Sequence, residues 1–295
     1  MSATVFFQQL INGVSLGSLY ALIAIGYTMV YGILRLINFA HGDLLMVSAY
    51  SAIYGIMVFS LPWYLGFPLA ILFTGVIGIV LDRAAYRPLR EAPRISLLIS
   101  AIGASFLLEN IALVAIGGVP KPFPRPAVFD HVIIVSGLHI QVLTIYTPLV
   151  TGVLLLGLLT IIYRTKTGKA MRAASRDFET TRLMGINLDR IIAVTFFLGS
   201  TLAGAAGIMW AMKYPQVNPF IGIIPGLKAF IAAVLGGIGN IVGAVIGGFL
   251  LGLGEILIVA VAPELAQYRD AFAFVVLILV LLFRPTGIMG EPIIE

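Results

Sequence analysis

A regular series of charged side chains lies in the most basic segment of the chain, residues 164–190. Its members are separated by three, four and three residues: Lys169, Arg172, Arg176 and Glu179. Such spacing places side chains on one face of a helix, and we expect this helix to end at Gly185, because glycine is favoured just beyond a helix C-terminus. A short charged helix of this kind suits docking into a groove of a soluble partner protein. The simpler alternative is a basic anchor beside anionic lipid.

A second group of polar residues, Asn38, His41 and Asp43, follows the first long apolar stretch. A metal or proton site is one interpretation, but a metal centre needs more ligands at defined spacings. A polar turn between two helices is the simplest alternative. We favour a structural break in a helix, whose polar groups shape a pore or contact a neighbour, since Asn and Asp are good helix-capping residues.

A glycine-rich stretch near the C-terminus carries eight glycines between positions 236 and 254, with Gly239, Gly243 and Gly247 spaced four residues apart. This pattern favours close packing between membrane helices. The phosphate-binding pattern Gly-x-x-x-x-Gly-Lys-Ser/Thr does not occur in the sequence, so the chain lacks the usual loop for ATP hydrolysis. We therefore expect no enzymatic activity and no cofactor or metal bound to this chain itself.

Three ionisable residues, Glu109, Lys228 and Glu255, lie within apolar stretches. Carboxylates inside a membrane are costly and often functional, so a proton relay is one interpretation. Packing or subunit contact is favoured, because the carboxylates are scattered. A secondary transporter would need clustered coupling-ion residues. A membrane-embedded enzyme would need paired catalytic residues or metal ligands, and the three histidines do not form a His-Glu-x-x-His motif.

The composition places these residues in a membrane. Of the 295 residues, 60% are hydrophobic and 11% are charged, whereas soluble domains carry roughly 25% charged residues. Cysteine is absent, which excludes a disulfide scaffold, thiolate catalysis and cysteine metal sites. The net charge of +5 reports membrane orientation before it reports an acidic partner, and no nucleic-acid partner is expected.

Apolar stretches of about 20 residues predict helices that cross the membrane. We expect an all-α fold, a polytopic integral membrane helical bundle with about eight spans plus broken or re-entrant segments, in a single domain of residues 1–295. A short segment at 226–238 precedes a glycine-rich break, and no internal repeat is evident. The expected spans are residues 1–34, 44–60, 65–81, 95–116, 144–163, 191–212, 241–262 and 266–284.

The basic residues predict the orientation. Segments 82–94 and 164–190 together hold 11 of the 18 Lys and Arg residues, and both should be cytoplasmic by the positive-inside rule. The Pro-rich segment 117–143 then faces outside. Arg284 favours a cytoplasmic C-terminus, which requires 226–238 to cross fully. The first 34 residues carry no charge and do not orient the N-terminus.

Several motifs, taken together, resemble the LivH-type permeases, which are inner-membrane subunits of bacterial ABC importers for branched-chain amino acids. The resemblance covers nearly the whole chain and is weakest at 117–143. The motifs are NGVSLGSLYALIAIGYTMVYGILRLINFAHGD from Asn12 to Asp43, AYRPLR from Ala85, LISAIG from Leu98, GKAMRA from Gly168 with GIN at Gly185–Asn187, KAF from Lys228, AVLGGIG from Ala233 and RPTGI from Arg284.

The resemblance implies a set of partners. A second, LivM-like permease would complete the translocation path, two cytoplasmic ATPase subunits would use the ATP, and a periplasmic substrate-binding protein would deliver an amino acid substrate. Membrane lipid would surround the chain in the bacterial inner membrane. The loop at about 164–190 matches the coupling loop that contacts the ATPase, and its candidate residues are Gly168, Lys169, Arg172, Ala173, Arg176, Glu179, Gly185 and Asn187.

The substrate is expected to be a zwitterion with an apolar side chain, which needs apolar walls and a few polar groups. Candidate residues of the translocation path are Asn12, Asn38 and Asn240, which lie near glycine-rich breaks. The alternatives are a permease for urea, short amides or broader neutral amino acids, or, less favoured, a secondary transporter.

Overall fold

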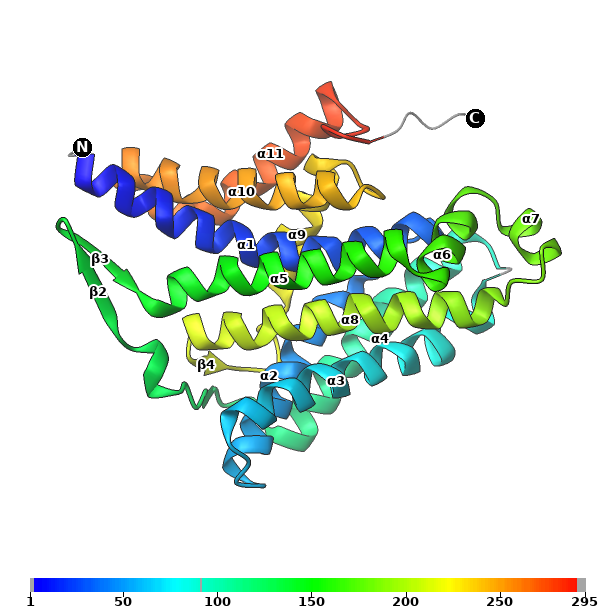
Figure 1. Cartoon of the computed structure of the whole chain (residues 1–295), viewed down its shortest axis with the longest axis horizontal. Coiled ribbons are helices and arrows are strands. Elements are labelled where there is room, and N and C mark those ends of the chain that lie inside the picture. The colour runs from blue at the N-terminus through cyan, green and yellow to red at the C-terminus, as the bar shows by residue number, and fades with distance from the viewer. Residues whose placement is uncertain (1–2, 91, 291–295) are drawn as a thin grey trace.

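The computed structural model describes residues 3–90 and 92–290 and shows a bundle of long helices (Figure 1). The bundle forms because most helices are apolar over their whole length. Their backbone N–H and C=O groups are hydrogen-bonded within each helix, as a membrane requires. The helices are α1 (Ala3–Leu34), α2 (Asp43–Met57), α3 (Trp63–Leu81), α4 (Arg94–Ile116), α5 (Val142–Arg164), α6 (Lys166–Arg176), α7 (Phe178–Leu183), α8 (Leu188–Lys213), α9 (Ile223–Gly236), α10 (Ile241–Val261) and α11 (Arg269–Phe283).

The expected fold class, a polytopic helical membrane protein, is confirmed. Within the described residues, seven helices are long and apolar enough to cross a membrane. The span count therefore differs slightly from the expected eight, because the segment expected at 44–60 forms the 15-residue helix α2. The segment expected at 226–238 forms α9, which is 14 residues long. Neither helix alone reaches across a hydrocarbon core about 30 Å thick.

Two short sheets lie at one end of the bundle, hereafter the hairpin end (Figure 1). Strands β2 (Val132–Val135) and β3 (Leu138–Gln141) form an antiparallel hairpin. Its two turn residues have positive φ angles of 50° and 83°, the conformation that suits the twist of a tight hairpin. Strands β1 (Lys121–Pro122) and β4 (Gln216–Val217) form the second pair. The hairpin was not expected from the sequence of the Pro-rich segment.

The two basic segments lie together at the opposite end, hereafter the basic end. There, Arg87 and Arg90 form ion pairs with Asp189, so the predicted placement of both segments on one side is confirmed. The start of α1 lies at the hairpin end, because the main-chain N–H of His139 donates a hydrogen bond to Gln8 Oε1 at 2.9 Å. The described C-terminal residues lie at the basic end beside the end of α9, where the N–H of Ile288 donates to the Leu235 carbonyl at 2.9 Å.

Helices α2 and α9 both begin in the middle of the bundle. After α1 ends, the chain turns back at Arg35, whose φ is 54°. His41 then packs against Gly26 of α1, at the level where Gly26 contacts Gly199 of α8. Gly199 lies about 16 Å of helix from the start of α8, which is half a bilayer thickness. Gly42, just before α2, packs closely against Gly222, just before α9.

From this meeting point, α2 runs to the hairpin end and α9 runs to the basic end. In both pairs, α1 with α2 and α8 with α9, a long helix is followed by a half-helix that runs back from mid-bundle to the end where the long helix began. The two pairs run in opposite directions, as in the inverted repeats of many transporters. Because residues 214–222 lead inward from the hairpin end and α9 completes the passage, the C-terminal region reaches the basic end. The C-terminus was predicted to lie on the side of the basic segments, which required 226–238 to cross the membrane fully. In the structure the half-helix α9 is sufficient, because residues 214–222 cover the other part of the passage.

Glycines let α10 approach two neighbours closely. On one face, Gly243 and Gly247 pack against the backbone of α9, and on the other face Gly248 and Gly252 pack against α1. Methyl groups at these positions would overlap neighbouring backbone atoms. The glycine-rich stretch is therefore a packing element, as predicted, and it holds the half-helix α9 against α1.

Candidate functional site

The segment between Arg164 and Arg190 forms two helices rather than one. Asp177 has an extended backbone, ends α6 and caps α7 by accepting a hydrogen bond from the Thr180 N–H at 3.2 Å. The predicted single face is therefore wrong, because Glu179 lies in α7 whereas Lys169, Arg172 and Arg176 lie in α6. The hydrogen bonds from the Thr180 hydroxyl and N–H hold the pKa of Asp177 below its usual value, so this cap is ionised at neutral pH.

Helix α6 is fixed to the bundle by small and apolar residues. Gly168 sits directly under the end of α5, where a methyl group would overlap the carbonyl groups of Ile161 and Ile162. Met171 and Ala174 are buried, so this face of α6 points into the bundle. These contacts fix the start of α6 directly against the end of α5.

The charged residues of α6 differ in their exposure to solvent. The guanidinium of Arg172 lies 4.9 Å from the ring centre of Tyr163, a cation–π contact that occupies it within the chain. Lys169, Ala173 and Arg176 are exposed. The exposed surface of α6 is therefore formed by these three residues more than by Arg172.

The most exposed apolar side chains of the segment lie at the C-terminal end of α7. Leu183 is 87% exposed and Met184 is 77% exposed. Gly185, with a φ of 78°, turns the chain directly after them, as expected beyond a helix end. Sequence reasoning missed this pair, although two apolar residues between Arg182 and Gly185 outside any span could have indicated a contact surface.

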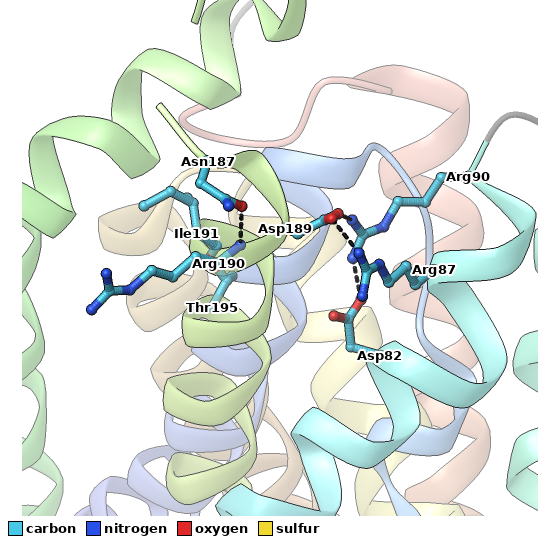
Figure 2. Close-up of polar contacts among 8 residues, drawn as sticks. All are labelled: Asp82, Arg87, Arg90, Asn187, Asp189, Arg190, Ile191 and Thr195. Carbon is cyan, nitrogen blue, oxygen red and sulfur yellow. Dashed lines mark hydrogen bonds and ion pairs between the residues drawn. The ribbon is translucent and has the colours of Figure 1, made fainter. Parts of the chain in front are cut away.

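An ion-pair cluster ties the end of this segment to the first basic segment (Figure 2). Asn187 caps α8 by accepting a hydrogen bond from the Arg190 N–H at 3.0 Å, which aims the next residues into the bundle. Asp189 then pairs with Arg87 at 2.5 Å and with Arg90 at 2.6 Å. Arg90 also pairs with Asp82 at 2.6 Å, so one guanidinium joins α8 to the end of α3. Sequence reasoning missed this cluster, because its members are about 100 residues apart.

The three asparagines proposed for the translocation path lie at different levels of the molecule. Asn12 lies in α1 toward the hairpin end, where its Nδ2 donates to Gln9 Oε1 at 3.3 Å. Asn38 is buried in the break before α2 and accepts a hydrogen bond from the Tyr86 hydroxyl at 2.5 Å. Asn240 lies at the basic end, where it caps α10 and donates to the Met289 carbonyl at 3.0 Å. The structure does not bring them together, and their role in a path stays a prediction.

The buried carboxylates have partners that the sequence did not indicate. Lys228 of α9 pairs with Glu255 of α10, and also with Asp270 of α11 at 2.6 Å. The Tyr20 hydroxyl of α1 donates to Glu255 at 2.9 Å. This group, hereafter the Lys228 network, joins the half-helix α9 to α1, α10 and α11.

A second buried carboxyl group lies at the start of α2. Asp43 accepts a hydrogen bond from the Ser105 hydroxyl of α4 at 2.5 Å, and the carboxyl group of Glu109, also on α4, lies beside it. Asp43 lies in the first turn of α2, where the helix dipole favours a negative charge. This contact fixes the start of the half-helix against α4.

Together, these features give a bundle with a basic end, an exposed apolar pair near that end and two half-helices that begin in mid-bundle, as the discontinuous helices of many transporters do. Comparison with known proteins identifies the family. The family described as "Branched-chain amino acid transport system / permease component" matches residues 9–281. The chain is 44% identical, over 98% of its length and 97% of the relative's, to the high-affinity branched-chain amino acid transport system permease protein BraD of Pseudomonas aeruginosa.

Two further relatives extend the comparison. The LivH permease protein of the corresponding high-affinity system in Escherichia coli K12 is 43% identical, covering 98% of this chain and 97% of the relative. A probable LivH permease protein of Methanocaldococcus jannaschii is 27% identical over 92% of this chain and 89% of the relative. The chain therefore belongs to the branched-chain amino acid transport system permease component family, as a multi-pass membrane protein.

Proposed function

We propose that this chain is a permease subunit of an ABC importer in the bacterial inner membrane, and that it carries branched-chain amino acids. The observation that carries the proposal is the identity of 43–44% over nearly the full length to permeases named for high-affinity branched-chain amino acid transport. The partners would be a second permease, two cytoplasmic ATPase subunits that hydrolyse ATP, and a periplasmic substrate-binding protein. The chain itself would perform no catalysis.

The basic end would receive the motion of the ATPases. The exposed pair Leu183 and Met184 would enter a groove of the ATPase surface, with Lys169 and Arg176 beside it. A displacement of α7 would reach α8 through Asn187 and Asp189, and it would reach α3 through Arg90. This route gives the ion-pair cluster of Figure 2 a mechanical role in alternating access.

The meeting point of α2 and α9 is the proposed level of the translocation path. Transporters commonly bind substrate near the bilayer midplane between discontinuous helices. Beside this point, Phe220, Ile223 and Ile224 are exposed, and their apolar surface suits a branched aliphatic side chain. The second permease would close this surface from the other side.

Uptake into membrane vesicles supplied with the cognate binding protein and ATP tests the substrate. Labelled leucine should accumulate, and unlabelled isoleucine and valine should suppress its uptake, whereas urea and a short amide should not. Competition by urea or the amide as strong as that by isoleucine would contradict the proposed substrate. A purified chain that transports leucine without any partner subunit would contradict the ABC assignment.

A further inference from the structure

A cavity of about 400 Å³ opens at the basic end between the end of α3 and the start of α8. Its size is within the range of small-molecule sites. One part of its wall is charged and includes Arg83 and Arg87. The other part is apolar and includes Ile79, Val194 and Phe197. The cavity thus joins a cationic rim to an apolar floor at the boundary where two membrane helices end.

The rim carries more positive charge than its own carboxylates neutralise. Asp82 and Asp189, the acidic residues of the wall, are already paired with Arg90 and Arg87. Arg83 is exposed and, within the part of the chain that the structure describes, forms no ion pair. An anionic group beside Arg83 and Arg87 would therefore find an unneutralised guanidinium.

The face of α3 that carries Ile79 stays apolar toward the middle of the membrane. Val76 and Leu72 follow Ile79 along this face at intervals of about one helical turn, and each is about half exposed. Since α3 is a membrane-spanning helix, this face runs from the cavity into the hydrocarbon region. An occupant of the whole feature must place an anion at the rim and an aliphatic tail along this face.

We propose that this cavity binds one anionic phospholipid of the leaflet at the basic end. Its phosphate lies beside Arg83 and Arg87, and its acyl chains follow α3. A soluble phosphate would satisfy the rim but not the floor, whereas a soluble protein surface would not reach the floor. Basic pockets between helices on the cytoplasmic side are a known mode of lipid recognition. Because Arg87 also pairs with Asp189, the bound lipid would stabilise the cluster that joins the two basic segments.

Native mass spectrometry of the purified transporter complex tests the proposal. The complex, stripped of lipid and titrated with phosphatidylglycerol or phosphatidylcholine, should retain one phosphatidylglycerol and release phosphatidylcholine. The Arg83→Gln variant should bind phosphatidylglycerol about fivefold more weakly, because a basic residue near a lipid headgroup contributes on the order of that factor. The matched control Arg182→Gln, which removes an exposed arginine of α7, should bind it as the parent protein does.

A second variant tests the apolar floor. Val194→Phe fills the cavity without changing its charge, and it should also release the lipid. Full retention by both Arg83→Gln and Val194→Phe would overturn the proposal. Displacement of the lipid by millimolar inorganic phosphate would overturn it in favour of a free-anion site. Loss of ATPase subunits from Arg83→Gln, with its lipid retained, would overturn it in favour of a protein contact surface.

Discussion

Lys228 and Glu255 are 2% and 0% exposed and form an ion pair within the membrane-spanning bundle. Removing two charges from water is expensive, and their attraction compensates only when further hydrogen bonds satisfy them. The Tyr20 hydroxyl and Asp270 supply such contacts. The pair is therefore costly to assemble, and it is most costly when only one member is present. Its position on α9 suggests that it sets the place of the half-helix.

Replacing Lys228 alone should destabilise the protein strongly. The Lys228→Met variant leaves Glu255 buried, with Arg269 at 3.5 Å as its remaining cation, and such losses cost about 3–5 kcal/mol. Thermal unfolding of the purified complex in detergent would measure the effect. The matched control Arg87→Met breaks an ion pair whose side chains are about half exposed, and it should cost about 1 kcal/mol or less.

The double variant Lys228→Met, Glu255→Gln separates charge from packing. It removes both charges, so it should recover a large part of the stability lost in Lys228→Met. If the single variant unfolds at the temperature of the parent protein, or if the double variant is less stable than the single one, the pair does not hold α9 as argued.

At the scale of elements, the sequence predicts the long helices and the breaks before Asp43 and after Gly236 well, but it does not predict how deep in the bundle the short helices begin. Continuous apolar stretches predicted α1, α4, α5, α8 and α10 within a few residues, because membrane burial demands such stretches. The glycine pattern predicted close packing of α10. It did not indicate that α2 and α9 begin in mid-bundle, since that depends on Gly42 meeting Gly222, 180 residues away. The break at Asp177 was also missed, because the local sequence is compatible with a continuous helix as well as with a helix cap at this residue.

The candidate functional surfaces also differ in how far the sequence predicted them. The basic segment 164–190 was predicted as a contact surface from local charge spacing. The ion-pair cluster and the Lys228 network depend on residues that only the tertiary fold brings together. Leu183 and Met184 were missed, because an apolar pair is ordinary in a sequence that is 60% hydrophobic. They indicate a contact surface only because the fold leaves them exposed outside the membrane-spanning helices.

Adding one methyl group at the meeting point should separate the two half-helices. Gly222 has an ordinary negative φ of −80°, so alanine is conformationally acceptable there, but its methyl group would overlap the Gly42 carbonyl. Gly222→Ala should therefore cost about 1–3 kcal/mol and reduce leucine uptake. Thermal unfolding and vesicle uptake would measure the two effects.

Gly152→Ala in α5 is the matched control. No atom lies within 4 Å of an added methyl group there, and alanine is the better helix former by up to about 1 kcal/mol. This variant should keep uptake and gain slight stability. Equal behaviour of Gly222→Ala and Gly152→Ala would show that the close approach of α2 and α9 is not needed.

Removing the exposed apolar side chain at the end of α7 should uncouple the ATPases. Leu183→Ser should weaken ATPase binding by roughly 30-fold, as expected for loss of a central contact worth about 2 kcal/mol. Co-purification of the ATPase subunits and substrate-stimulated ATP hydrolysis would measure this effect. Ile134→Ser, at an exposed apolar residue of the hairpin, is the control and should leave both unchanged. Coupled uptake equal to that of the parent protein would remove α7 from the docking surface.

The whole molecule has two chemically distinct ends. One end gathers the basic segments 82–94 and 164–190, and the other carries the hairpin and the start of α1 (Figure 1). Between them, α3 and α4 expose apolar side chains along their length, which suits contact with lipid or with a second permease. The described C-terminal residues are tied to the end of α9. The charge difference between the ends orients the protein, and everything proposed for docking depends on that orientation.

The orientation can be measured directly, because the chain contains no cysteine and no native residue needs to be replaced first. Positive charge on short loops is retained in the cytoplasm, so Ala173→Cys in α6 should resist a membrane-impermeant maleimide in intact cells. Ile134→Cys in the hairpin should react in intact cells, because the same rule predicts that the hairpin end faces the periplasm. Inverted vesicles should reverse both results. Reaction of Ala173→Cys in intact cells would place the basic end outside, and no ATPase could then reach Leu183. Since both positions are exposed in the fold, a difference between them reports the side of the membrane and not burial within the chain.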